Sequence, residues 1–175
     1  SISGGLVVES AWMFDSSGFA LAPGFIDVHS HGDFHVLIEP EVCHNILQGI
    51  TTAIVGNCGC GAAGSAAGKI QMKAINEPSV ALPDWTGYAG YLEHVDKTSP
   101  VLNIAALIGH HTARREAMGG VADRPPSEIE LDSMLVNVTE GMAAGAVGIS
   151  TGLVYEPGRY AETDASESLA HGGGK

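Results

Sequence analysis

The sequence predicts an α/β fold in which parallel strands alternate with helices. Short apolar runs rich in β-branched residues recur at 25–28, 51–55, 102–108 and 146–150. The runs are apolar throughout rather than alternating, and segments with helical features lie between them. Strands that are buried on both faces and connected through helices are typical of a sheet built from βαβ units.

The chain begins with a different pattern. The runs Leu6–Val8 and Phe19–Leu21 have the composition of strands, and Asp15–Gly18 between them has the composition of a turn. We interpret residues 1–22 as the remnant of a small β domain.

The first βα unit follows Pro23-Gly24. Phe25–Val28 is an apolar strand that leads directly into His29-Ser30-His31. Pro40 and Glu41 suit the first turn of a helix that ends at Gly49.

Three further strands are predicted, and segments with helical features lie between them. Thr51–Val55 ends at Gly56-Asn57-Cys58-Gly59, and Leu102–Ile108 ends at Gly109-His110. A helix is expected over Trp85–Val95 between these two strands. A fourth strand is expected over Ala146–Ser150.

The helix before the fourth strand has the clearest signal. Ser127 and Glu130 form a capping box, and the apolar residues that follow share one helical face until Gly145. We expect this helix to pack its apolar face on the sheet.

An open doubly wound sheet and a (β/α)8 TIM-type barrel both fit these elements. No glycine-rich dinucleotide fingerprint or phosphate loop follows the first strand, and the His-x-His pair in its place favours the barrel. We therefore predict about the first four βα units of a barrel over 23–164, after the β remnant at 1–22. Residues 165–175 are expected to form a flexible tail.

His29 and His31 lie at alternate positions of an extended segment, so both side chains can approach one metal ion. Neutral imidazoles suit zinc, and Asp27 or Asp33 is a candidate for orienting the rings. Cys58 ends the second strand, where its thiolate would face the same side of the sheet. Two surface histidines and a buried structural thiol are the alternative interpretations.

Two other residues at strand ends are candidates for binding substrate. His110 follows the third strand and Tyr155 the fourth. The alternatives are a loop or capping role for His110 and ordinary loop packing for Tyr155. Arg114 and Arg115 are expected to pair with surface acids such as Glu116 or Asp123.

Composition narrows the class of protein. The formal charge is −12, with the acidic residues scattered, which argues against a nucleic-acid or anionic-membrane partner and favours small molecules. No apolar run approaches the roughly 18 residues of a membrane span, and no signal peptide is recognisable, so we expect a cytoplasmic protein. The odd number of cysteines, three, argues against a scaffold held by disulfides. As metal ligands, Cys43 and Cys60 are weaker candidates than Cys58.

Several of these motifs resemble a known family. Ala22–His31 is similar to the opening barrel strand of the amidohydrolase superfamily, and Gly49–Gly59 resembles its N-acyl-D-amino-acid deacylase branch, the D-aminoacylases. The segments that resemble this branch further along are, in the same order, 109–114, 122–125 and 145–155.

The resemblance implies a hydrolase that uses one or two zinc ions to cleave the amide bond of N-acyl-D-amino acids. It implies that His29 and His31 are metal ligands, that Cys58 takes the bridging position, and that Tyr155 helps to hold the substrate. His110 matches a family position without an assigned role.

The family's remaining histidine ligands and its catalytic aspartate come from later strands than the four found here. We therefore expect this chain to be a truncated fragment with negligible activity of its own, and its exposed barrel edges to favour self-association. Two alternatives stay open. One is a cyclic amidase of the dihydroorotase or hydantoinase type, against which Cys58 argues, and the other is a non-catalytic, metal-binding half-barrel that self-associates.

Overall fold

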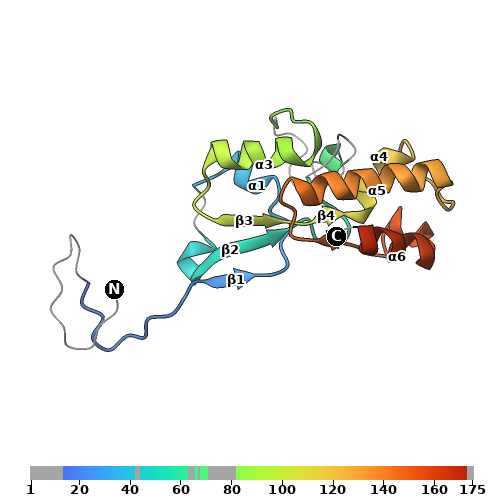
Figure 1. Cartoon of the computed structure of the whole chain (residues 1–175). Coiled ribbons are helices and arrows are strands. Elements are labelled where there is room, and N and C mark those ends of the chain that lie inside the picture. The colour runs from blue at the N-terminus through green and yellow to red at the C-terminus, as the bar shows by residue number, and fades with distance from the viewer. Residues whose placement is uncertain (1–13, 42–43, 63–65, 67, 71–81, 173–175) are drawn as a thin grey trace.

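The computed structural model describes residues 14–41, 44–62, 66, 68–70 and 82–172. Its helices and strands confirm an α/β fold (Figure 1). In chain order they are β1 (Phe25–Asp27), α1 (His35–Ile38), the 3-10 helix η1 (Ile46–Gln48), β2 (Ile50–Val55), α3 (Gly87–Thr98), β3 (Asn103–Ala106), β4 (Ile108–Gly109), α4 (His110–Ala117), α5 (Glu128–Ala143), β5 (Ile149–Ser150), the 3-10 helix η2 (Gly158–Tyr160) and α6 (Thr163–Gly172).

All the strand pairs are parallel, and neighbouring strands follow chain order. One sheet has the order β1-β2-β3, and a second pairs β4 with β5. The two sheets meet at Leu107, whose N–H donates to Val55 O over 2.9 Å, while the N–H of the next residue, Ile108, donates to Gly148 O. The predicted strand 102–108 is therefore split, because its backbone changes partner from β2 to β5 at this residue.

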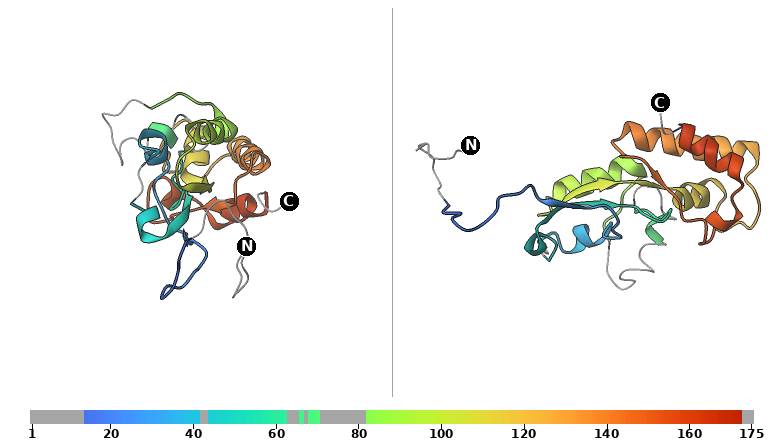
Figure 2. Two further views of the ribbon diagram at one scale, coloured as in Figure 1. Left: turned by 90° about the vertical axis from the view of Figure 1, so that its left-hand side faces the viewer. Right: turned by 90° about the horizontal axis from the view of Figure 1, so that it is seen from below.

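The helices pack one face against the strands. Tyr88, Tyr91 and Val95 of α3 are buried, as are Met134 and Val138 of α5, and all five belong to the main hydrophobic core. The two helices lie along the same side of β3 (Figures 1 and 2). The core therefore lies between β2–β4 and the helices.

The capping box of α5 is confirmed. Ser127 Oγ accepts the N–H of Glu130, and the Glu130 carboxylate accepts the N–H of Ser127 over 2.8 Å. Arg124 adds two donors, at 2.8 and 2.7 Å, and together with Ser127 these bonds lower the Glu130 pKa to about 2. The start of this helix is thus fixed by its own sequence.

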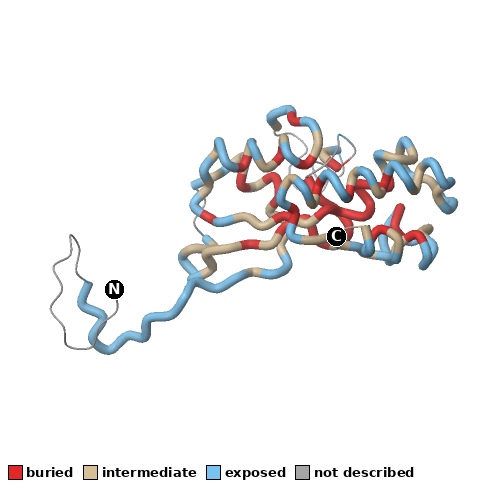
Figure 3. Tube along the Cα trace, viewed as in Figure 1, coloured by how far each residue is buried: buried red, intermediate tan, exposed pale blue. Residues whose placement is uncertain are grey.

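The sheet is partial and does not close. Among the described residues, strand β1 pairs with β2 alone, and Figure 3 shows most of β1 as exposed, in contrast to the buried segments at the centre of the molecule. Residues 14–24 are exposed and extend away from the body (Figure 1). No helix in the part of the chain that the structure describes is long and apolar enough to cross a membrane.

Three sequence-based expectations about secondary structure are wrong. Pro40 and Glu41 form a turn after the short α1 instead of opening a helix, and Leu47 further along is 80% exposed. Residues 19–21 form no strand and are exposed. Residues 165–172, expected as the start of a flexible tail, belong to α6, because Ala165 and Leu169 bury one helical face beside α5.

Two other expectations need refinement. The segment after the third strand contains a helix, α4, that the sequence pattern did not predict. Leu6–Val8 and Cys43 lie outside the described residues, so the proposed β remnant is represented here only by residues 14–22.

Candidate metal centre

His29, His31 and Cys58 come together at the carboxyl ends of β1 and β2. One potential ligand atom from each side chain lies within 4.8 Å of those of the other two. Cys58 Sγ lies 3.3 Å from His29 Nε2, and the two imidazole rings are 5.6 Å apart between centroids. Two imidazoles and a thiol at this spacing are a donor set that fits zinc.

Electrostatics favour the ligand form of His31. Burial, and secondarily the nearby His29, lowers the pKa of His31, so its imidazole stays neutral to lower pH than an exposed one. A neutral imidazole is the form that binds a metal ion.

The neighbouring carboxylates do not orient the imidazoles as expected. Asp27 Oδ1 accepts the backbone N–H of His29 over 3.1 Å. Asp33 is fully buried, and its Oδ2 accepts the N–H of Ala62 over 3.1 Å, while burial raises its pKa to about 6. Both carboxylates therefore hold backbone segments, Asp27 beside the ligands and Asp33 across to the loop after Cys58.

Cys58 lies in a tight turn with an unusual backbone conformation. Cys58 and Gly59 have φ values of 57° and 77°, and the N–H of Cys60 donates to Asn57 O over 3.0 Å, which is the pattern of a type I′ turn. A non-glycine residue in the left-handed region costs about 1–2 kcal/mol. The surrounding bonds therefore have to hold Cys58 in this conformation.

Residues of β5 and of α4 brace this turn. Ser150, at the end of β5, accepts the N–H of Gly59 over 3.0 Å, and its hydroxyl donates to Gly56 O. Gly59 O accepts the N–H of His111 over 2.8 Å. The turn is thus connected to β5 and to the start of α4.

The predicted substrate residue Tyr155 lies on a loop against the Cys58 turn. A Cβ on Gly152 would come within 2.5 Å of Cys58 O and 3.1 Å of the Tyr155 ring, so the loop and the turn are in close contact. The Tyr155 side chain is 54% exposed. The Tyr155 ring is therefore exposed on a loop that contacts the Cys58 turn.

His110 does not lie in a loop but opens α4, where it is buried. Its Nδ1 lies 3.1 Å from Thr151 Oγ1, and its Nε2 has no hydrogen-bond partner among the residues that the structure describes. Burial, followed by the charges of His111 and Arg114, lowers its pKa to about 4. The structure therefore connects His110 with the Tyr155 loop through Thr151 and leaves one ring nitrogen available.

The two arginines of α4 do not pair with surface acids as expected. Arg114 is fully buried and donates from Nη2 to the carbonyl oxygens of Ala122 and Arg124. Arg115 donates to Glu156 O over 3.3 Å. Both arginine side chains donate to backbone carbonyls of loops. Reasoning from charge alone does not predict such contacts.

The residues that sequence reasoning missed are Asn57 and Ser150. Each lies directly beside a motif that was recognised, at the end of a strand. The only available signal was a small polar residue where an apolar strand meets a glycine-rich turn, and this signal does not say which backbone groups the side chain will contact.

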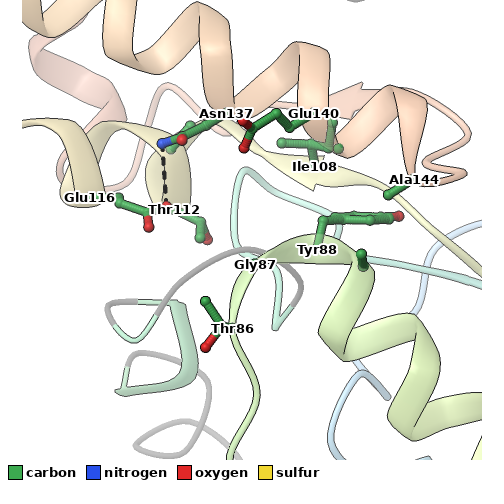
Figure 4. Close-up of a pocket in the computed structure, with 12 residues that line it drawn as sticks. Thr86, Gly87, Tyr88, Ile108, Thr112, Glu116, Asn137, Glu140 and Ala144 are labelled. Atoms are coloured by element: carbon green, nitrogen blue, oxygen red, sulfur yellow. Dashed lines mark hydrogen bonds between the residues drawn. The ribbon is translucent and has the colours of Figure 1, made fainter.

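A cavity lies elsewhere in the molecule. A space of about 260 Å³ opens between α3, α4 and α5, and Figure 4 shows Glu116, Glu140 and Asn137 around it. Asn137 donates to Glu116 over 3.3 Å, and burial, together with Glu140, raises the Glu116 pKa. None of the three metal-ligand candidates lines this cavity, so it is separate from the metal centre.

Comparison with known proteins points to one family. N-acyl-D-glutamate deacylase of Alcaligenes xylosoxydans xylosoxydans is 38% identical over 161 residues, covering 89% of this chain and 32% of that protein. The solved N-acyl-D-glutamate deacylase of Bordetella bronchiseptica, bound to zinc and a phosphonate mimic of the tetrahedral intermediate, superposes with a TM-score of 0.74 at 36% identity. It covers 86% of this chain, and this chain covers 31% of it.

A solved D-aminoacylase with a binuclear metal centre gives a TM-score of 0.73 at 31% identity, and the shares covered are again 86% of this chain and 31% of that one. The chain thus spans about a third of the length of the relatives it matches. The family model described as amidohydrolase family matches residues 13–172. With this match over most of its length, the chain belongs to the amidohydrolase family and is similar to its N-acyl-D-amino-acid deacylases.

Proposed function

We propose that this chain supplies the first metal ligands of a zinc-dependent deacylase that hydrolyses the amide bond of N-acyl-D-amino acids. The observation that carries the proposal is the convergence of His29, His31 and Cys58 at the ends of two parallel strands. Its support from relatives is the 36% identity to a deacylase solved with zinc and a mimic of the tetrahedral intermediate.

The proposed roles follow from the chemistry of the side chains. His29, His31 and Cys58 would hold zinc, with Cys58 bridging if two ions bind, and zinc supplies Lewis-acid activation of the amide carbonyl and of water. Tyr155 would donate a hydrogen bond to the substrate from the loop beside the Cys58 turn. His110 would position that loop through Thr151 Oγ1 or bind substrate through Nε2.

The group formed by these three ligands includes no carboxylate from the described residues. Deacylation needs a base to take a proton from water and an acid to give one to the leaving amine. We propose that the residue serving both purposes lies outside this chain, so that the chain alone has negligible turnover.

We further propose that residues 23–164 are the first four βα units of a (β/α)8 barrel. The parallel strands in chain order support this, as does the similarity to D-aminoacylase structures. On this view the exposed edge at β1 needs a neighbour, which the rest of a barrel or a second copy would supply.

A graft tests the proposed function. The matched third of the N-acyl-D-glutamate deacylase would be replaced by this chain, and hydrolysis of N-acetyl-D-glutamate, N-acetyl-D-methionine and their L-enantiomers would be measured with zinc present. We expect hydrolysis of a D-substrate by the graft, none by the 175-residue chain alone, and loss of the graft's activity on Cys58→Ser. A folded, zinc-loaded graft without D-specific activity would contradict the proposed function.

The other readings make different predictions in the same assay. A cyclic amidase would open a hydantoin or dihydroorotate ring and leave N-acyl-D-amino acids intact. A non-catalytic, metal-binding half-barrel would form zinc-loaded dimers of the chain and give an inactive graft.

A further inference from the structure

The two turns that carry the metal ligands are joined by one buried side chain. Asn57 precedes Cys58 and is 7% exposed. Its Nδ2 donates to Ser30 O over 3.2 Å and to Ile54 O over 2.8 Å. Ser30 is the residue between the two ligand histidines, so this amide connects the histidine turn to the end of β2.

We infer that Asn57 is a positioning residue for the metal centre, an inference that rests on the proposed function. It holds the carbonyl between His29 and His31 at a fixed distance from the turn that presents Cys58. The Asn57 side chain has two N–H donors on one nitrogen, and both are used, one on the histidine turn and one on the end of β2. No aspartate can replace this function, because a carboxylate has no proton to donate at neutral pH.

The geometry gives Asn57 more influence than an ordinary buried amide has. In the part of the chain that the structure describes, Ser30 and the end of β2 share one further hydrogen bond, from the N–H of Ser30 to Ile54 O at 3.0 Å. Cys58 itself is in the left-handed region, a conformation that depends on its neighbours. Loss of the Asn57 amide would therefore change the separation of Cys58 Sγ from the two imidazoles, and not only the stability of the turn.

Asn103 is a matched control. Its Nδ2 also donates to a carbonyl of β2, Thr51 O, over 2.7 Å, but it is exposed and lies at the opposite end of the strand pair from the ligands. Asn57→Asp and Asn103→Asp therefore remove the same kind of bond from the same strand. Only the first bond reaches a turn that carries ligands.

The experiment titrates the full chain with cobalt(II) and zinc. A thiolate-to-cobalt charge-transfer band per bound ion reports whether Cys58 coordinates, and competition with a chelator gives the zinc affinity. We expect Asn57→Asp to lose most of the band and to weaken zinc binding by about 10–100-fold, the range typical of residues that orient ligands. Asn103→Asp should keep the band and bind within about twofold of the wild type.

The outcomes separate this inference from the proposed function. A full band and wild-type zinc affinity in Asn57→Asp would overturn the positioning role and leave the ligand set intact. A wild-type chain that binds cobalt without a thiolate band would overturn the ligand set, and this inference with it. If Asn57→Asp does not fold, Asn57→Ala removes the amide without adding a charge and is judged by the same readout.

If neither variant folds, the wild-type chain provides the test through its nitrogen-15-labelled side-chain amides. The positioning role requires that the Asn57 NH₂ signals shift when zinc is added, while those of Asn103 stay in place. Unchanged Asn57 signals on a zinc-loaded chain would overturn it.

Discussion

The histidine turn and the cysteine turn bring together the three candidate metal ligands, but the fold holds the two turns very differently. His29 and His31 follow β1, which has one strand neighbour among the described residues and whose Phe25 and Ile26 are 65% and 60% exposed. Cys58 follows β2, which has a neighbour on each side and whose last residue, Val55, is fully buried. Two of the three candidate ligands follow the edge strand of the sheet, and the third follows its central strand.

This difference shows which half of the site is preorganised by the chain itself. The cysteine turn is held by Ser150 and by the start of α4, both distant in sequence. The histidine turn depends on β2 and on the bonds that Asn57 and Ile54 make to Ser30. We expect changes on the cysteine side to have large effects on stability and metal binding, and equivalent changes along β1 to have small ones.

The largest effect is expected from removing the thiolate. Cys58→Ser replaces a strong zinc ligand with a neutral hydroxyl, so zinc affinity should fall by at least about 100-fold, the upper end of what loss of a ligand-orienting residue costs. Isothermal titration of the chain with zinc measures this. Cys60→Ser is the control, because Cys60 faces His111, with Sγ 3.5 Å from Nδ1, and lies outside the ligand group. Equal losses in both variants would show that the Cys58 thiolate is not a ligand.

A glycine pair tests how rigidly the cysteine turn is packed. Gly56 has a φ of 81°, and an added Cβ would lie 2.3 Å from Leu107 O, which is backbone and cannot move away alone. Gly119 has a similar φ of 71° but open space around it. Gly119→Ala should lose about 1 kcal/mol through backbone strain, and Gly56→Ala about 1–3 kcal/mol more through overpacking. Urea denaturation curves measure the free energy of unfolding of both variants. Equal losses of stability would mean that the cysteine turn shifts easily to accommodate a Cβ at position 56.

Sequence reasoning succeeded where local chemistry decides the structure and failed where distant contacts do. The capping box at Ser127 fixes the start of α5 with neighbouring residues, and the β-branched run 51–55 forms the central strand as expected. Leu169 was assigned to a flexible tail because its burial depends on packing against α5, which no local pattern reveals.

The candidate site shows the same limit. The three ligands were predicted from their positions at strand ends, and the structure brings them together. The Asn57 and Ser150 contacts were not predicted, because their partners are 27 and 91 to 94 residues away in the chain. The buried Arg114 was placed on the surface for a similar reason, since its acceptors are backbone carbonyls of a loop.

One substitution at the end of each strand sharpens the comparison between the edge and the centre of the sheet. Val55→Thr buries a hydroxyl at the end of β2 and should lose about 1–3 kcal/mol of stability. Val28→Thr introduces the same hydroxyl beside β1, where the side chain is exposed, and should change stability by less than about 0.5 kcal/mol. Denaturation of both variants under one set of conditions measures the difference. A large loss in Val28→Thr would show that a partner covers β1 in solution.

A change of pH tests the packing on the cysteine side in a different way. His110 and His111 adjoin the Cys58 turn, and burial lowers the pKa of each from its ordinary 6.5 to about 4. Between pH 6.5 and about 4, both histidines stay neutral in the folded chain, while the same histidines take up protons in the unfolded chain. Their contribution to the free energy of unfolding is therefore complete above pH 6.5 and is lost as the pH falls toward 4. His110→Asn keeps a polar atom near Thr151 and cannot titrate, so its stability should fall less steeply over this range in metal-free buffer. The same substitution at His171, exposed on α6, is the control. A slope in His110→Asn equal to that of the wild type would mean that His110 is solvated rather than buried, and that the cysteine side is less well packed than the contacts around Gly59 indicate.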